Sequence, residues 1–290
     1  MTYNYYITNN NLNLNVKTHN VKNPQAVLIH IHGLGGHFQA KYNKYDSLEY
    51  RITMCASDII SYGFELRGHG KSEGDRFMID CFDKYIDDLD KLVEYISRVH
   101  HSLQIFIIGC SMGGAICISY SIKYPNKISG IILLAPMTGL SNELDKSWVK
   151  MKIIIGIAYL FPSYKMISIS TNERYIDEYM TYKSQCPYQN KEWIRLDTSI
   201  ECYYTMRWIQ DNSHLLTIPV LSFHSKLDRT TSYKTTVDFI KKCSSTDKTN
   251  ILLESGRHNL LVPTDIDDTQ PDKILHTINQ WLNNRINRTL

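Results

Sequence analysis

The stretch Gly109-Cys110-Ser111-Met112-Gly113-Gly114 follows a continuous apolar run at 103–108 and precedes a helical pattern that extends to about residue 124. A nucleophilic serine on a sharp strand-to-helix turn needs a glycine two positions before it and another two positions after it, because neighbouring elements crowd the backbone there. The Gly-x-Ser-x-Gly motif centred on Ser111 meets this need in the required context. It predicts a catalytic serine; the alternative is a glycine-rich helix start capped by a serine.

The segments on both sides of this turn alternate between strand and helix patterns. Short apolar runs predict strands buried on both faces, and apolar residues three and four apart predict helices. We therefore expect an α/β protein with a mostly parallel central sheet and helices on both faces. The expected strands are 26–31, 59–66, 103–108, 128–134, 219–223 and 250–253, preceded by an antiparallel pair at 3–8 and 12–17, and the expected helices are 82–99, 112–124, one around 233–240 and one that begins near Pro271.

The alternation breaks between residues 139 and 216, where helical segments occur without a clear buried strand. We interpret 139–216 as a helical cap, or lid, that is inserted into the fold. Residues 1–138 and 217–290 then form the core.

The composition excludes several classes of protein. The chain has 290 residues, of which 43% are hydrophobic, so neither a disordered chain nor a polytopic membrane protein is expected. Its net charge is only +3, so a dedicated nucleic-acid binder is not expected either. The seven cysteines are odd in number and form no C-x-x-C pair, which indicates a reducing, cytoplasmic location and neither a disulfide framework nor a zinc knuckle. The N-terminus lacks the pattern of a signal peptide.

The stretch His32-Gly33-Leu34-Gly35 follows the strand 26–31 and predicts an oxyanion loop. Ester hydrolysis builds negative charge on the carbonyl oxygen, and two backbone N–H groups aimed at that oxygen stabilise it. The candidate donors are the N–H groups of Leu34 and of Met112, the residue after the nucleophile. The alternative is a glycine turn without a catalytic role.

A serine nucleophile needs a base, and the base needs a carboxylate to orient it. In sheets of this type the chain order is serine, acid, histidine. Asp228 follows the strand 219–223 and His258 follows the strand 250–253, so both are expected at carboxyl ends of strands, where ligands bind in open α/β sheets. Asp238 and Asp265 are weaker candidates for the acid, because one is on a helix and the other comes after the histidine.

Together these motifs resemble the α/β-hydrolase superfamily, and within it the branch of monoglyceride lipases and lysophospholipases. The resemblance covers nearly the whole chain after the first twenty residues. It implies Ser111 as the nucleophile, His258 as the base, Asp228 as its partner, and Leu34 and Met112 as oxyanion donors. The matching stretches are His32–Gly35, Gly109–Gly114 and Phe64-Glu65-Leu66-Arg67-Gly68-His69-Gly70-Lys71-Ser72-Glu73-Gly74, in which Arg67 and His69 are expected to support a turn.

The chain departs from the branch at two places, and the first of them concerns the substrate. Gly36 and Ala40 stand where the monoglyceride lipases usually carry an acidic residue and an arginine, which are linked there to the glycerol end of the site. The glycine of the common H-G-x-x-D pattern before the acid is Ser225 here, although His224 and Asp228 are kept. One device that selects glycerol is therefore missing.

The sequence predicts a serine hydrolase that cleaves carboxylic esters of single-chain lipids, monoacylglycerols or lysophospholipids, without a metal or an organic cofactor. The apolar run from Trp148 to Phe161 predicts a cap that contacts an acyl chain or a membrane surface; ordinary cap core is the alternative. A short-chain esterase or thioesterase on the same triad, or a non-catalytic lipid-binding or interaction protein, are the competing functions.

Overall fold

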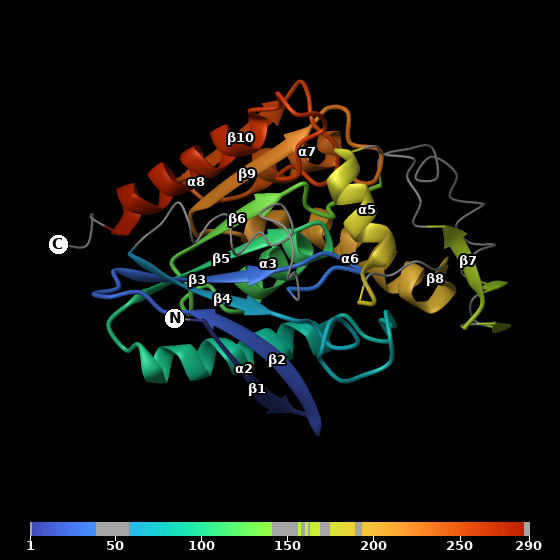
Figure 1. Cartoon of the computed structure of the whole chain (residues 1–290), viewed down its shortest axis with the longest axis horizontal. Coiled ribbons are helices and arrows are strands. Elements are labelled where there is room, and N and C mark those ends of the chain that lie inside the picture. The colour runs from blue at the N-terminus through green and yellow to red at the C-terminus, as the bar shows by residue number, and fades with distance from the viewer. Residues whose placement is uncertain are drawn as a thin grey trace.

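The computed structural model describes residues 2–38, 58–140, 156–157, 160–161, 163–168, 175–188 and 193–286. Within these ranges a central sheet of eight strands is flanked by helices (Figure 1). The strands lie in the order β1-β2-β4-β3-β5-β6-β9-β10. Their bounds are Thr2–Asn9 (β1), Leu12–His19 (β2), Ala26–Ile31 (β3), Ile59–Phe64 (β4), Gln104–Cys110 (β5), Gly130–Leu134 (β6), Val220–Ser225 (β9) and Lys248–Leu253 (β10).

The six strands from β4 to β10 are parallel, and β1 and β2 join them as an antiparallel edge. The register aligns the strand ends, because Ile31 of β3 lies opposite both Phe64 of β4 and Gly109 of β5. The loops that follow these strands therefore begin side by side at one edge of the sheet. The predicted mostly parallel α/β architecture is confirmed.

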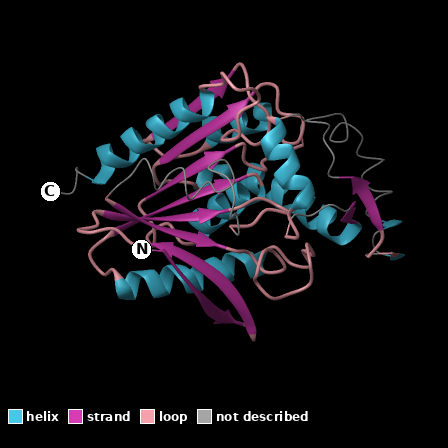
Figure 2. Cartoon of the chain, viewed as in Figure 1, coloured by secondary structure: helices cyan, strands magenta, loops and turns pink. Residues whose placement is uncertain are grey.

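Helices cover both faces of the sheet (Figure 2). The alternation within β3 shows why, since Val27 and Ile29 face one apolar core and Leu28 faces the other. Helices α2, α3 and α7 pack into the first core, and α8 packs into the second. Their bounds are Asp83–Val99 (α2), Met112–Lys123 (α3), Tyr233–Lys242 (α7) and Gln270–Ile286 (α8). All four expected helices are confirmed.

The segment between β6 and β9 contains more than the expected helices. Helices α5 (Asp177–Gln185) and α6 (Leu196–Asn212) accompany two short antiparallel strands, β7 (Lys165–Ser168) and β8 (Trp193–Arg195), and a 3-10 turn at Ser213–Leu215. Strands of four and three residues are too short to show alternation in the sequence, so the pattern did not indicate them. Helix α6 packs into the same apolar core as α3, whereas α5 lies beyond the strand ends (Figure 1).

No helix in the described parts of the chain combines the length and the apolar character needed to cross a bilayer. The six cysteines in those parts are all free thiols; Cys55 lies outside the described residues.

A buried ion pair ties the loop after β4 to α2. Arg67 donates from Nε and Nη2 to the two carboxylate oxygens of Asp88, both at 2.6 Å, and Asn9 of β1 donates to the same carboxylate at 2.7 Å. The side chain of Asp88 is fully buried. Together with the bond from His69 Nδ1 to the Arg67 carbonyl oxygen at 2.8 Å, this confirms that Arg67 and His69 support a turn.

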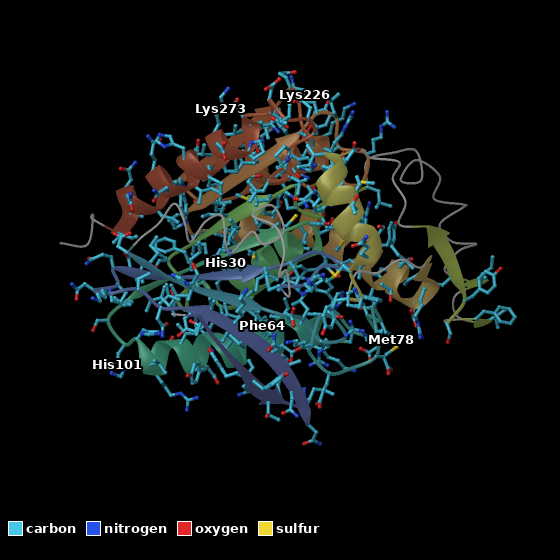
Figure 3. All side chains as sticks on the ribbon, viewed as in Figure 1. His30, Phe64, Met78, His101, Lys226 and Lys273 are labelled. Atoms are coloured by element: carbon cyan, nitrogen blue, oxygen red, sulfur yellow. The ribbon has the colours of Figure 1, made fainter. Side chains whose placement is uncertain are left out.

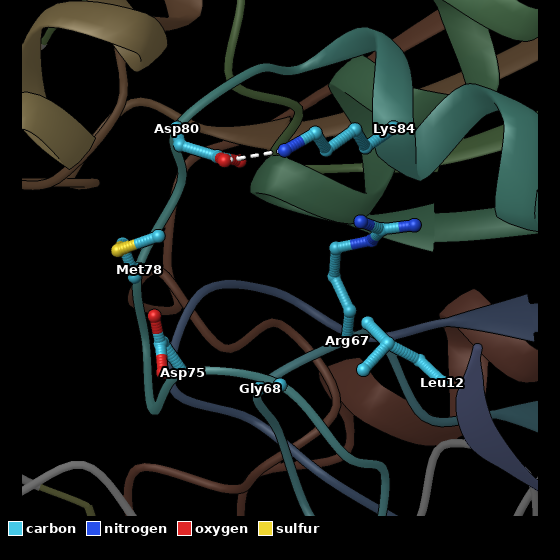
Figure 4. A pocket seen from close by; sticks show the side chains of 8 residues that line it. Leu12, Arg67, Gly68, Asp75, Met78, Asp80 and Lys84 are labelled. Atoms are coloured by element: carbon cyan, nitrogen blue, oxygen red, sulfur yellow. Dashed lines mark hydrogen bonds and ion pairs between the residues drawn. The ribbon is translucent and has the colours of Figure 1, made fainter. Parts of the chain in front are cut away.

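A cleft of about 250 Å³ lies beside this ion pair, where Lys84 forms an ion pair with Asp80 (Figure 4). Its lining residues include Arg67, Asp75 and Met78 but none of the predicted catalytic residues.

The Asp88 carboxylate should be a main source of stability. We expect Asp88→Ala to lower the free energy of unfolding by about 3–5 kcal/mol, because it leaves the Arg67 charge buried without its partner. Urea denaturation measures this loss. Asp83→Ala on the same helix is the control: Asp83 is 76% exposed and 4.0 Å from Lys123, and its removal should cost less than about 1 kcal/mol. Equal losses in the two variants would contradict the buried-pair interpretation.

Candidate active site

Ser111 lies in the tight turn between β5 and α3, in a strained backbone conformation with φ 54° and ψ −117°. A residue other than glycine rarely adopts positive φ, and such strain persists only where the surroundings impose it. Here the surroundings are crowded: a Cβ on Gly109 would lie 2.3 Å from the carbonyl oxygen of Gly113, and a Cβ on Gly113 would lie 2.3 Å from that of Ile31. The two glycines therefore let β3, β5 and α3 meet at Ser111.

The neighbouring Cys110 is not a competing nucleophile. Burial, with a contribution from the charge of Asp228, raises the pKa of the Cys110 thiol to about 12. At neutral pH it is therefore a thiol, whereas the reactive form is the thiolate.

The loop after β3 passes directly over Ser111. An ideal Cβ on Gly33 would lie 3.1 Å from the Cβ of Ser111 and 3.7 Å from its Oγ, so the backbone of the predicted oxyanion loop is adjacent to the serine. Leu34, the next residue, packs against the first apolar core. Met112 is the first residue of α3, and its N–H is one of those at a helix start that have no acceptor within the helix. The structure thus brings both predicted donors to the turn that holds Ser111.

His32 fixes the start of this loop. Its Nε2 accepts a hydrogen bond from the Leu66 N–H at 3.1 Å, so its Nδ1 carries the proton and donates to the Gly33 carbonyl oxygen at 2.8 Å. Burial, together with the nearby His69, holds the pKa of His32 well below its usual range. The ring is therefore neutral and links the ends of β3 and β4.

Glu65 is a buried carboxylate that joins three segments, and the sequence analysis assigned it no role. It accepts hydrogen bonds from the Phe38 N–H at 2.8 Å, from the Lys71 N–H at 2.7 Å and from the Asn15 side chain at 2.8 Å. Phe38 belongs to the loop after β3, so this carboxylate anchors the far end of the oxyanion loop. Gly70 has no room for a side chain here, because a Cβ would lie 2.2 Å from the carboxylate.

Asp228 and His258 meet beyond β9 and β10. His258 Nδ1 lies 2.8 Å from Asp228 Oδ2, and the Asp228 side chain is fully buried while that of His258 is 17% exposed. Burial alone would raise the pKa of Asp228, but the facing His258 and the hydrogen bonds from His224 and His258 outweigh it and hold the pKa well below its usual range. An ionised, buried carboxylate that accepts from Nδ1–H selects the tautomer of His258 in which Nε2 carries the lone pair, the form that a base needs.

A short series of contacts connects this pair with the turn at Ser111. The carbonyl oxygen of Ser111 accepts from the Met137 N–H at 2.9 Å. Two residues earlier, the carbonyl oxygen of Ala135 lies 3.2 Å from Thr231 Oγ1, which is also 3.0 Å from Asp228 Oδ2. The serine turn and the acid–histidine pair are thus fixed to the same short segment after β6.

A second histidine, which the sequence analysis noted only as the retained histidine of the H-G-x-x-D pattern, also contacts the acid. His224 on β9 is fully buried, and its Nε2 lies 3.2 Å from Asp228 Oδ2. Its position four residues before Asp228 in the H-x-x-x-D pattern was the available signal.

The residues that flank helix α5 contact both loops of the site. On one side the Asn259 N–H, next to His258, donates to the Tyr175 hydroxyl at 2.9 Å. On the other side, just past the end of α5, Cys186 Sγ lies 3.1 Å from Nε2 of His37 in the loop after β3. Such contacts between distant segments leave no periodic mark in the sequence.

Several residues that the sequence analysis named lie outside the described residues: Ala40, Trp148 and most of the apolar run that follows it. Of that run, Ile157, Leu160 and Phe161 are described and are 39%, 70% and 62% exposed.

The comparisons with known proteins identify the family and the fold. The model of the family described as serine aminopeptidase, S33, matches residues 22–265. The chain is 26% identical to a monoglyceride lipase of Mus musculus over 91% of this chain and 84% of that protein. It is 24% identical to a monoglyceride lipase homolog of Monkeypox virus over 91% of both chains. Its structure matches that of a soluble monoglyceride lipase variant from Saccharomyces cerevisiae, in complex with a substrate analog, with a TM-score of 0.80, 20% identity and coverage of 98% and 95%.

The glycine requirement at position 113 can be tested directly. Gly113→Ala should lower the free energy of unfolding by about 1–3 kcal/mol, because the added methyl group forces the start of α3 away from β3. Thermal and urea unfolding give the change. Gly156→Ala is the matched control, since a Cβ there meets no atom of the described residues within 4 Å. A Gly113→Ala protein as stable as the control would show that the turn is not crowded in solution.

Proposed function

Since the chain belongs to the serine aminopeptidase S33 family of α/β-hydrolases, we propose that it is a serine hydrolase that cleaves carboxylic esters of single-chain lipids. The observation that carries this proposal is the buried Asp228–His258 pair at the edge of the sheet where the strained Ser111 lies. Similarity to monoglyceride lipases over most of the chain favours ester hydrolysis over peptide hydrolysis.

In the proposed mechanism, His258 Nε2 takes the proton of Ser111 Oγ while that oxygen attacks the ester carbonyl carbon. The Nδ1–H donated to Asp228 keeps Nε2 unprotonated at the start and stabilises the imidazolium that forms. The ester C–O bond then breaks, His258 gives its proton to the leaving alcohol oxygen, and an acyl-enzyme remains. Water, deprotonated by His258, attacks the acyl carbon. The bond from that carbon to Ser111 Oγ then breaks and His258 returns the proton to Oγ, which releases the fatty acid and regenerates Ser111.

In this proposal the N–H groups of Leu34 and Met112 stabilise the negative charge of each tetrahedral intermediate. The proximity of Gly33 to Ser111 and the position of Met112 at the start of α3 support this role. His32 and Glu65 fix the two ends of the loop, so the donor from Leu34 needs little rearrangement when charge develops.

A single-chain lipid is the substrate class that the surface and the site favour. The segment proposed as a cap carries three exposed apolar side chains, Leu160, Phe161 and Tyr164, whose exposed fractions are 70%, 62% and 60%. Such side chains suit contact with an acyl chain or with a membrane surface that supplies it. Gly36 offers no side chain to bind glycerol, so other head groups should be accepted.

Ser111→Ala should abolish hydrolysis and leave the fold intact. Loss of the nucleophile of a triad lowers kcat by about 10⁴–10⁶-fold. Hydrolysis of dodecanoylglycerol and covalent labelling by a fluorophosphonate probe, which requires an activated serine, both report it. Ser119→Ala, on α3, is the control and should keep full activity. Residual hydrolysis above about a hundredth of the wild-type rate in Ser111→Ala would reassign the nucleophile, and a wild-type protein that takes no label would favour a non-catalytic lipid-binding function.

Substrate preference separates a lipase from a short-chain esterase or thioesterase. We expect kcat/KM to rise from two-carbon to twelve-carbon alkyl esters, since each buried CH₂ contributes about 0.8 kcal/mol. Monoacylglycerols and lysophosphatidylcholines of equal chain length should differ far less from each other. A steep preference for the two-carbon ester would contradict the lipid assignment, and a strict requirement for glycerol would move head-group recognition to other residues.

A further inference from the structure

We propose that His224 is a positioning residue for the catalytic acid: its Nε2–H donates to Asp228 Oδ2 and holds the carboxylate in the orientation that His258 needs. The inference rests on the proposed function, because it concerns the acid of the same triad. The proposed site then consists of four residues, Ser111, His258, Asp228 and His224. His224 touches no reacting atom.

The position of His224 fixes its relation to the acid. His224 lies near the end of β9 and Asp228 follows in the turn after that strand, and both side chains are fully buried. Nε2 of His224 is 3.2 Å from Asp228 Oδ2 and 3.3 Å from both the carbonyl oxygen and Oγ1 of Thr231. An ionised carboxylate and a carbonyl oxygen can only accept, and the single proton of Thr231 Oγ1 has acceptors in Asp228 Oδ2 and the Ala135 carbonyl oxygen, so a proton on Nε2 satisfies the most contacts.

The other nitrogen of the ring supports the same assignment. Nδ1 of His224 lies 2.9 Å from Thr236 Oγ1 on α7, and that oxygen lies 2.9 Å from Thr138 Oγ1 after β6. Each group can donate toward the acid: Thr138 to Thr236, Thr236 to Nδ1, and Nε2–H to Asp228. Thr236 Oγ1 also lies 3.4 Å from the carbonyl oxygen of Ser232, but Nδ1 of His224 is the nearer acceptor. The series runs in one direction and ends on the carboxylate that faces His258.

The need for this donor follows from the surroundings of Asp228. Its Oδ1 accepts from the N–H groups of Thr230 and Thr231 at 2.7 and 3.0 Å. Its Oδ2 faces the Nδ1 of His258 at 2.8 Å and Thr231 Oγ1 at 3.0 Å. The single proton of that hydroxyl can also go to the carbonyl oxygen of Ala135 at 3.2 Å, and a buried carboxylate oxygen needs more than one donor to offset the loss of water. His224 supplies such a donor from the strand side, so the carboxylate does not rotate away from His258.

Substitution of His224 by glutamine or by asparagine distinguishes this positioning role from simple packing. In His224→Gln the amide nitrogen reaches the position of Nε2 and can still donate to Asp228. In His224→Asn the shorter amide reaches only the position of Nδ1 and loses that bond. The control for burying an amide in the sheet is His30→Asn (Figure 3). His30 on β3 is also fully buried, and its two ring nitrogens have no hydrogen-bond partner among the described residues.

We expect kcat to fall in His224→Asn and to be largely restored in His224→Gln. His224→Asn should lower kcat and the rate of fluorophosphonate labelling by about 10- to 100-fold with KM nearly unchanged, as expected when a hydrogen bond to a charged group is lost. His224→Gln should recover most of this loss, and His30→Asn should melt at a lower temperature without a comparable loss of kcat. Equal kcat in wild type and in folded His224→Asn would overturn the proposal, as would losses in both His224 variants that match that of His30→Asn.

A measurement on the wild-type protein tests the hydrogen bond without any variant or substrate. Nitrogen-15 NMR of the histidine rings should show His224 with a protonated Nε2 and an unprotonated Nδ1, and His258 with a downfield Nδ1 proton. The opposite tautomer at His224 would overturn the proposal even if the protein hydrolyses lipid esters. If the protein hydrolyses no ester, the proposed function fails, while the NMR result still decides whether His224 donates to Asp228.

Discussion

The close approach of β3, β5 and α3 at Ser111 is the constraint on which the rest of the site depends. There is room at positions 109 and 113 for hydrogen atoms only, and this lack of space holds Ser111 at φ 54°. The same contact brings the backbone of Gly33 to the serine. One packing contact therefore positions both the proposed nucleophile and the proposed oxyanion loop.

Two buried carboxylates complete what the packing begins. Glu65 collects donors from three segments and anchors the loop that starts at His32, and Asp228 collects donors from the turn after β9 and from two histidines. A buried charge is costly unless its oxygens are hydrogen-bonded, so each carboxylate fixes the loops that bring its donors. Tyr175 and Cys186, which flank helix α5, contact the loop of His258 and the loop after β3. The segment proposed as a cap is therefore connected to both loops that carry the proposed catalytic groups.

The sheet and its helices could be read from the sequence because their signals are local. Fully buried parallel strands appear as short apolar runs, as at 26–31 and 104–110, and α2 shows an apolar residue at each helical turn. The segment 139–216 gave a weaker signal. Its strands are very short, and α6 is set by packing against α3 rather than by a pattern of its own.

The sequence by itself determined the serine turn, since glycines two positions away on each side are a requirement of backbone space, and it indicated Asp228 and His258 through the order of strand ends. Only the tertiary structure decided which groups surround the acid. Residues 224, 228, 231, 236 and 258 converge because β9, β10 and α7 pack together, and a hydrogen bond between side chains on different elements has no period in the sequence. The role of Glu65 was likewise hidden, because its donors lie up to 50 residues away along the chain and meet it only after folding.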